Sequence, residues 1–181
     1  SDRYVAELRE LQVRGVKLER VTAHGAEGRV ALYVAPGATY SRILESTIIS
    51  HGGGGPTVYL GAESSRTVIK GSRLDARGSD REAIAVDASD HNEIRSNRIL
   101  GGSIKLYRNC GESGVTRHTT PSHNDITHNE FSGVVFHVWL SSRDGRRGFC
   151  GLDDGLSQWG SSQSNLDWAR GNRVHANSGG I

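Results

Sequence analysis

Hydrophobic residues recur along the chain as short alternations in which one residue separates two apolar ones. Five such alternations occur: Leu32/Val34, Val58/Leu60, Ile84/Val86, Ile104/Leu106 and Val138/Leu140. Alternate residues of a strand face opposite sides, so each alternation predicts a short strand with one buried face. Their first members recur at intervals of about 20 to 34 residues, the range expected of a solenoid built from stacked coils.

A second series follows the first and places two apolar residues five positions apart. Its members are Ile43/Ile48, Ile69/Leu74, Ile94/Ile99 and Ile126/Phe131, with Val16/Val21 as an earlier copy and Ala169/Val174 as a later one. A polar residue lies two positions before each second apolar residue: Glu19, Ser46, Ser72, Asn97, Asn129 and Asn172. We expect the asparagines to form a hydrogen-bonded ladder between stacked turns. No window keeps a helical period, which argues against a helical solenoid.

Local sequence repeats with this pattern, as "HNEIRSNRI" (91–99) and "HNDITHNEF" (123–131) show. These repeats resemble the right-handed parallel β-helix, or pectate-lyase-like, superfamily over about residues 13–181. The resemblance implies an all-β, right-handed parallel β-helix of about six coils that forms a single domain over residues 1–181. That superfamily includes polysaccharide lyases and hydrolases, uronate epimerases, phage tailspikes and surface adhesins, and the fold alone does not choose among them.

Composition narrows the possible partners. The 181 residues carry both charges interspersed and a formal net charge of only +2, without the basic tract that nucleic acid needs. No run of about 18 apolar residues occurs, so we expect no membrane-spanning segment. The 24 glycines favour short strands joined by turns.

Two connections are longer than the others, at residues 107–125 and 141–169, and each carries one cysteine. Long loops on a rigid scaffold are usually functional or disordered. Cys110 and Cys150 could form a disulfide, remain as two buried thiols or contribute half of a metal site. We favour a disulfide that clamps the two loops, because neither cysteine belongs to a CxxC motif. A disulfide implies a secreted or periplasmic protein.

The C-terminal "NSGGI" (177–181) resembles the "GGSI" (101–104) that opens a coil. We therefore expect the solenoid to be open at this end, as an incomplete fragment continued by a missing segment or capped by a second chain.

The middle residue of each alternation points away from the core, and stacking gives an outward column of Tyr33, Tyr59, Ala85, Lys105 and Trp139. The next outward column is Ala35, Gly61, Asp87, Tyr107 and Ser141. Exposed aromatic rings could stack on sugar rings, although Tyr and Trp also favour strands for their own sake. The predicted substrate-binding residues are Tyr33, Tyr59, Asp87, Trp139, Arg117, His137 and Arg143.

Candidate catalytic residues gather where the chain enters the first long connection: Lys105, Tyr107, Arg108, Glu112 and His118. Removing the proton next to a uronate carboxylate needs a base together with cations that stabilise the developing charge. A hydrolase would need two carboxylates, for which Asp87, Glu112, Asp153 and Asp154 are candidates. The Asp-Pro-His-Asp motif of epimerases is absent. His118, His123 and His128 lie five residues apart, but this spacing does not favour a metal site. His123 and His128 fall at repeat positions, with His91 in the same place as His123, and indicate turns. No metal or other cofactor is therefore required, although Ca²⁺ is compatible.

The sequence thus predicts a polysaccharide-active protein, first a lyase acting on a uronate-containing polymer along the Tyr33/Tyr59/Lys105/Trp139 face. The alternative is a non-catalytic carbohydrate-binding module of a surface adhesin or phage fibre. In both cases the expected partner is a polysaccharide.

Overall fold

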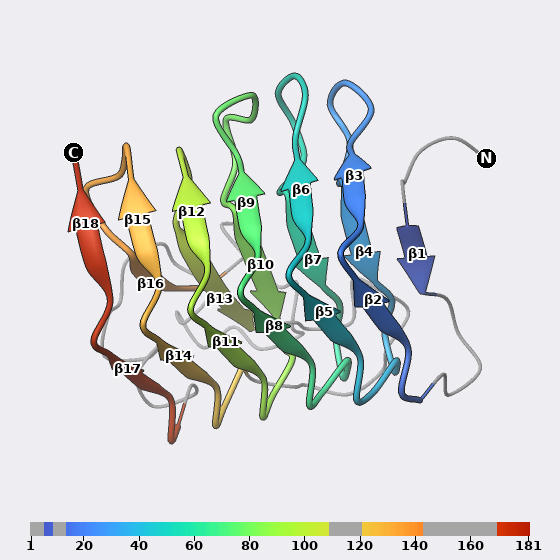
Figure 1. The fold of residues 1–181 in the computed structure, drawn as a ribbon. Helices are drawn as coiled ribbons and strands as arrows, with labels where there is room; N and C mark the ends of the chain where they lie inside the picture. The colour runs from blue at the N-terminus through green and yellow to red at the C-terminus, as the bar shows by residue number, and fades with distance from the viewer. Residues whose placement is uncertain (1–5, 9–13, 109–120, 143–169) are drawn as a thin grey trace.

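The chain forms three parallel β-sheets, each with six strands, in a computed structural model that describes residues 6–8, 14–108, 121–142 and 170–181 (Figure 1). Sheet 1 contains β1 (Ala6–Leu8), β4 (Leu32–Val34), β7 (Val58–Leu60), β10 (Ile84–Asp87), β13 (Ile104–Arg108) and β16 (Val138–Ser142). Sheet 2 contains β2 (Lys17–Glu19), β5 (Arg42–Leu44), β8 (Val68–Lys70), β11 (Glu93–Arg95), β14 (Asp125–Thr127) and β17 (Arg173–His175). Sheet 3 contains β3 (Thr22–His24), β6 (Thr47–Ile49), β9 (Arg73–Asp75), β12 (Arg98–Leu100), β15 (Glu130–Ser132) and β18 (Ser178–Gly180).

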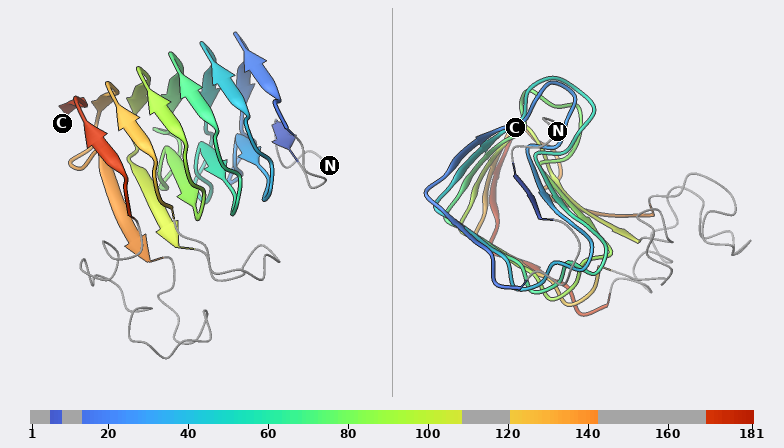
Figure 2. Two further views of the ribbon diagram at one scale, coloured as in Figure 1. Left: turned by 90° about the horizontal axis from the view of Figure 1, so that it is seen from below. Right: turned by 90° about the vertical axis from the view of Figure 1, so that its right-hand side faces the viewer.

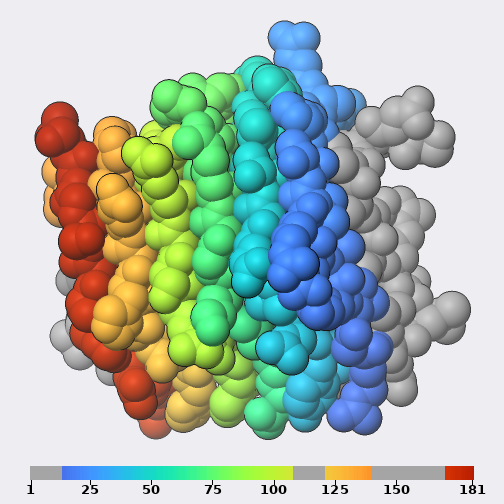
Figure 3. All heavy atoms as spheres, viewed as in Figure 1, coloured from blue at the N-terminus to red at the C-terminus, as the bar shows by residue number. Residues whose placement is uncertain are grey.

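The chain visits sheets 1, 2 and 3 in turn and then returns to sheet 1, one coil further along. The view along the axis in Figure 2 shows the coils superimposed around a common interior, and Figure 3 shows them as adjacent bands across one face. The predicted all-β parallel β-helix is therefore confirmed. The described part of the chain contains no helix, and so none with the length and hydropathy that a membrane-spanning helix needs.

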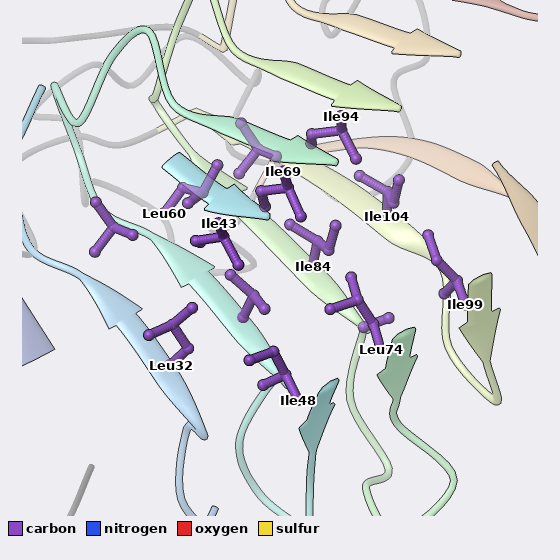
Figure 4. Packing of buried hydrophobic residues seen from close by; sticks show 14 of the residues in the cluster. Leu32, Ile43, Ile48, Leu60, Ile69, Leu74, Ile84, Ile94, Ile99 and Ile104 are labelled. Carbon is purple, nitrogen blue, oxygen red and sulfur yellow. The ribbon is translucent and has the colours of Figure 1, made fainter. Parts of the chain in front are cut away.

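One continuous hydrophobic core fills the interior (Figure 4). Leu32, Val58 and Ile84 lie in register on neighbouring strands of sheet 1, and all three are fully buried. Ile104 continues this column on β13. The predicted stacking of the apolar alternations is confirmed, because each coil presents its aliphatic side chains to the coils on either side.

An asparagine ladder crosses the tight turn between sheets 2 and 3. The side-chain oxygen of Asn129 accepts hydrogen bonds from the backbone N–H and the side-chain amide of Asn97, at 3.1 and 3.0 Å. Asn177 receives the same two bonds from Asn129. In the earlier coils, Ser46 and Ser72 occupy the equivalent positions. The ladder is thus confirmed, but Asn177 takes the place that the sequence pattern gave to Asn172.

Asn172 belongs to a second ladder, at the turn that leads into sheet 2. Its side-chain oxygen accepts from both the backbone and the side chain of Asn124, and Asn124 is bonded to Asn92 in the same way. The backbone N–H of Thr67 in turn donates to Asn92. Two buried polar ladders therefore run along the solenoid where the sequence pattern predicted one.

The strand register corrects the two terminal copies of the second apolar series. Leu18 and Ala23, rather than Val16 and Val21, pair with Ile43 and Ile48. At the other end Val174 pairs with Ile126, which makes it the first member of its coil instead of the second. Gly179 pairs with Phe131, and an added Cβ there would collide with the Phe131 backbone.

Several turns place a non-glycine residue at positive φ. His91 and His123 occupy one such position in successive coils, with φ of 53° and 57°, and their rings stack at 4.9 Å. His128 adopts φ of 55° at the turn between sheets 2 and 3. The turn role predicted for these histidines is therefore confirmed.

The two long connections begin later than expected, because β13 and β16 extend through Arg108 and Ser142. The predicted start of the first connection at Tyr107 is wrong, because both Tyr107 and Arg108 still belong to β13. Tyr107 remains in register with Asp87 on the outer side of sheet 1.

Candidate functional site

A groove of about 410 Å³ lies on the outer side of sheet 1, near the last two coils. Three connections and two strands form it: the β9–β10, β12–β13 and β15–β16 connections together with β13 and β16. The side chains that define its chemistry are Asp80, Arg81, Glu82, Lys105, Phe136 and Trp139. We call it the Glu82 groove.

Glu82 is the buried centre of the groove, with a side chain that is only 1% exposed. The phenol of Tyr107 donates a hydrogen bond of 2.9 Å to its carboxylate. Arg81 approaches the two carboxylate oxygens at 3.4 Å each, and the Lys105 ammonium lies 3.7 Å away. These last contacts are longer than the roughly 2.7–2.9 Å of a strong charge-assisted hydrogen bond. The two cations are therefore attracted to Glu82 without being fully engaged by it.

Two partners of Glu82, Tyr107 and Arg81, have shifted pKa values. Burial raises the pKa of the Tyr107 phenol well above its ordinary value, and the nearby charge of Glu82 adds to the shift. Burial disfavours the charged form of Arg81, but Glu82 and Tyr107 outweigh this effect and raise the pKa of the guanidinium. Tyr107 therefore stays a neutral hydrogen-bond donor, and Arg81 stays a cation.

The loop that carries Arg81 and Glu82 is held at its base by Asp75, the last residue of β9. Arg77 donates two hydrogen bonds to this buried carboxylate, at 2.8 and 2.6 Å, and Arg73 donates a third at 2.9 Å. Hydrogen bonding to the two guanidinium groups, first that of Arg77, lowers the pKa of Asp75 to about 2. Further along the loop, Asp80 accepts a bond of 2.7 Å from the backbone N–H of Gly54.

Aromatic side chains from the β15–β16 connection and from β16 form another wall of the groove. Phe136 and Trp139 meet edge to face, with ring centroids 4.7 Å apart, and are 56% and 43% exposed. Exposed aromatic faces beside convergent polar groups are typical of a ligand-binding surface.

A second aromatic pair lies on the same sheet, toward the N-terminal coils. Tyr33 and Tyr59 are in register on β4 and β7, are partly exposed and have ring centroids 5.2 Å apart. The Tyr59 hydroxyl donates to the carboxylate of Asp87. Asp87 and Ala85 are fully buried, although both belong to the outward columns. The expected exposure of this part of the outward columns is therefore wrong for Ala85 and Asp87.

The structure brings some of the predicted site residues together. Lys105 points outward between the buried Ile104 and Leu106, as expected, and lines the groove. Tyr107 lies beneath the groove rather than on its surface. His137 lies elsewhere: its ring stacks on Phe131 at 4.5 Å and a ring nitrogen lies 3.1 Å from the carbonyl oxygen of Gly179.

Other predicted residues fall outside the part of the chain that can be described. Arg108 lies in β13, but only its backbone is described. The remaining ones are Cys110, Glu112, Arg117, His118, Arg143, Cys150, Asp153 and Asp154, all outside the described residues. Their roles, including the disulfide, stay predictions.

Sequence reasoning missed Arg81, Glu82 and Phe136. All three lie in the connections that precede sheet 1, outside the apolar alternations that guided the search. One signal was present: "DRE" (80–82) directly precedes Ala83 and Ile84, where the preceding coil has uncharged residues. A charged residue next to a core strand indicates a buried ion that needs partners.

Within the described ranges, no cluster of three or more histidine, cysteine, aspartate or glutamate side chains is arranged to hold a metal ion. Comparison of the chain with protein families, curated proteins and solved structures finds no match.

Proposed function

We propose that this parallel β-helix binds an acidic, uronate-containing polysaccharide in the Glu82 groove and cleaves it by β-elimination. The observation that carries the proposal is the combination of two loosely held cations with an exposed aromatic pair in one groove. The resemblance of the repeats to the pectate-lyase-like superfamily supports the same class of ligand.

The cations are available to a ligand, whereas their counter-ion is not. Side chains of Lys105 and Arg81 are 33% and 45% exposed, but the Glu82 carboxylate beneath them is buried. A sugar carboxylate in the groove would therefore meet an ammonium and a guanidinium, and the guanidinium fork suits a carboxylate. Phe136 and Trp139 can stack on the apolar face of a neighbouring sugar.

In the proposed reaction, a base takes the proton from the carbon next to the uronate carboxyl group. The electron pair of that C–H bond forms a carbon–carbon double bond, and the bond to the leaving sugar oxygen breaks, after which that oxygen takes up a proton. Arg81 and Lys105 would neutralise the carboxylate and stabilise the charge that develops on it. Among residues outside the described ranges, Glu112 and His118 are the predicted acid–base candidates.

One observation favours a second candidate, a carbohydrate-binding module without catalysis. The only carboxylate at the centre of the described groove, Glu82, is already bonded to Tyr107 and flanked by two cations, as a structural ion would be. A module of this kind would use the same groove and the same aromatic wall for binding alone.

The deciding experiment incubates the full chain with a panel of uronate polymers and follows the ultraviolet absorbance of the unsaturated product. Lys105→Ala should lower turnover by about 100-fold or more if the cation assists proton removal. Lys70→Ala, on the outer face of sheet 2, is the matched control and should have no effect.

Binding without any absorbance change would support the module instead, and Lys105→Ala should then weaken binding by about 1–3 kcal/mol. If no polymer binds and none gives an absorbance change, both candidate functions are refuted.

A further inference from the structure

Two histidines from neighbouring coils meet at the end of sheet 3. His24 is the last residue of β3, His51 follows β6 in the β6–β7 connection, and both side chains are exposed. His24 Nδ1 lies 2.9 Å from His51 Nε2, whereas the ring centroids are 5.2 Å apart and the ring planes differ by 9°. The two rings therefore direct a nitrogen atom toward each other instead of stacking face to face.

Backbone hydrogen bonds fix the positions from which the two side chains extend. The Gly25 N–H donates to the carbonyl oxygen of Ile49 at 2.8 Å, and the Gly28 N–H donates to that of His51 at 3.1 Å. His24 is in register with Ile49 on β6. The stacking of the coils thus holds the two rings near each other, and a ligand that joins them does not have to order the backbone.

Imidazole nitrogens that face each other are a suitable ligand pair for a transition metal. With metal–nitrogen bonds of about 2.0–2.1 Å, the two nitrogens would be about 2.9 Å apart at a right angle and about 3.3 Å apart at a tetrahedral angle. The observed 2.9 Å matches the right angle, which is typical of the tetragonal coordination of Cu²⁺ and Ni²⁺. A turn of the exposed rings would aim both lone pairs at the metal. The proton that the two nitrogens share would then move to the other nitrogen of its ring.

We propose that His24 and His51 form a binding site for Cu²⁺ and, with lower affinity, for Ni²⁺. Water completes the coordination, since two protein ligands are fewer than a structural or catalytic zinc site uses. The bound metal links the end of β3 to the β6–β7 connection, so it stabilises the folded form of these two coils. The site uses no residue of the Glu82 groove and is independent of the proposed function.

Other described histidine pairs provide the control. His91 and His123 stack with centroids 4.9 Å apart, and a ring nitrogen of His91 lies 3.2 Å from the Asp90 carboxylate. His128 and His175 meet edge to face at 6.1 Å. The described contacts of these pairs are between ring faces or edges and not between two ring nitrogens. Removing the His91/His123 pair should therefore leave the proposed site in place.

The test adds CuCl₂ to the full chain in a buffer that does not bind copper and measures affinity by titration calorimetry. His24→Gln and His51→Gln should each weaken binding by about 100-fold, because the remaining imidazole loses the effective concentration that the second one provides. The His91→Gln/His123→Gln protein should bind as the wild type does. Electron paramagnetic resonance should show two coupled imidazoles in the wild type and one in each single variant. Without metal, the single variants should keep the wild-type melting temperature, since both side chains are exposed.

A second measurement locates the metal in the fold. NiCl₂ should slow the hydrogen exchange of the β3 and β6 amides in the wild type but not in His24→Gln or His51→Gln. Wild-type copper affinity in these two variants, or an equal loss of affinity in the His91→Gln/His123→Gln protein, would overturn the proposal. Nickel binding without added protection of β3 and β6 would also overturn it, because the metal would then lie elsewhere.

Discussion

Two buried carboxylates hold the two ends of one loop, Asp75 where β9 ends and Glu82 just before β10. They differ in how they are paired. Asp75 receives three short hydrogen bonds from guanidinium groups, whereas Glu82 receives its one short bond from Tyr107. We therefore expect Asp75 mainly to stabilise the fold and Glu82 to hold the cations of the groove in place.

Asp75→Asn should destabilise the fold by about 1–3 kcal/mol, because it removes a charged acceptor from two arginines. The folded-state pKa of Asp75 is about 2, below its ordinary value of about 3.9. The contribution of ionised Asp75 to the free energy of unfolding is therefore complete above about pH 4 and is lost as the pH falls toward 2. Urea denaturation at a series of pH values measures the free energy of unfolding. In the Asp75→Asn variant, this free energy should fall less between pH 4 and pH 2 than in the wild type. An Asp75→Asn protein with the wild-type slope would contradict the assignment.

Tyr107→Phe should cost about 1–2 kcal/mol, because the buried Glu82 carboxylate loses its shortest hydrogen bond. Tyr40→Phe, which removes the hydroxyl of an exposed tyrosine at a turn, should cost less. Thermal melting of the three proteins compares them. Similar losses for both variants would mean that Glu82 does not depend on Tyr107.

At the scale of single elements, the ladders show why a chain with such short strands forms regular coils. Asn97 is buried and uses both ends of its amide, accepting from the Ser72 N–H and donating to Ile69 and Asn129. Each coil thus fixes the turn of its neighbour by hydrogen bonds as well as by apolar contact.

Asn97→Ala should destabilise the fold by about 2–4 kcal/mol, since it removes several buried hydrogen bonds at once. Asn97→Ser should cost less than half as much, because Ser72 already occupies the equivalent position one coil earlier. Chemical denaturation tests the ranking. A serine variant as unstable as the alanine variant would argue that the amide is indispensable.

Turn geometry gives a second test of the elements. Ser96 adopts φ of 54°, where the neighbouring coil has Gly71 at 62°. Ser96→Gly should be neutral or stabilising by up to about 1 kcal/mol, because glycine adopts this conformation without steric cost. Ser132→Gly in β15 should instead destabilise by about 0.5–1 kcal/mol. The two melting temperatures should therefore move apart.

The strands of sheet 1 could be predicted from sequence because Leu32, Val58 and Ile84 carry an unambiguous alternation. The end coils could not, since Val16 and Val21 imitate the spacing of Leu18 and Ala23, and only pairing with β5 and β6 fixes the register. Lys105 was found because it interrupts an apolar alternation. Glu82 was missed because it lies in a turn and is buried by contact with Tyr107 from the next coil, which the local sequence does not show.

At the scale of the whole molecule, each coil contacts only its neighbours, so stability is distributed along the axis. The core is fully buried from β4 to β13, whereas Val174 in the last coil is half-exposed. Backbone amides of β7 and β10 should therefore exchange hydrogen far more slowly than those of β17 and β18. Hydrogen exchange measured by mass spectrometry tests this, and uniform protection along the chain would indicate a single cooperative unit.

The ladder at the entrance to sheet 2 links residues 25 positions apart at Thr67 and Asn92, 32 apart at Asn92 and Asn124, and 48 apart at Asn124 and Asn172. The hydrogen bonds keep similar lengths of 2.8 to 3.0 Å at all three steps. The hydrogen bonds at this turn are therefore the same whether 25 or 48 residues separate the two residues that they join. Peptides could therefore be inserted before this turn by design, and longer loops could arise there in evolution, without a change in the stacking of the coils.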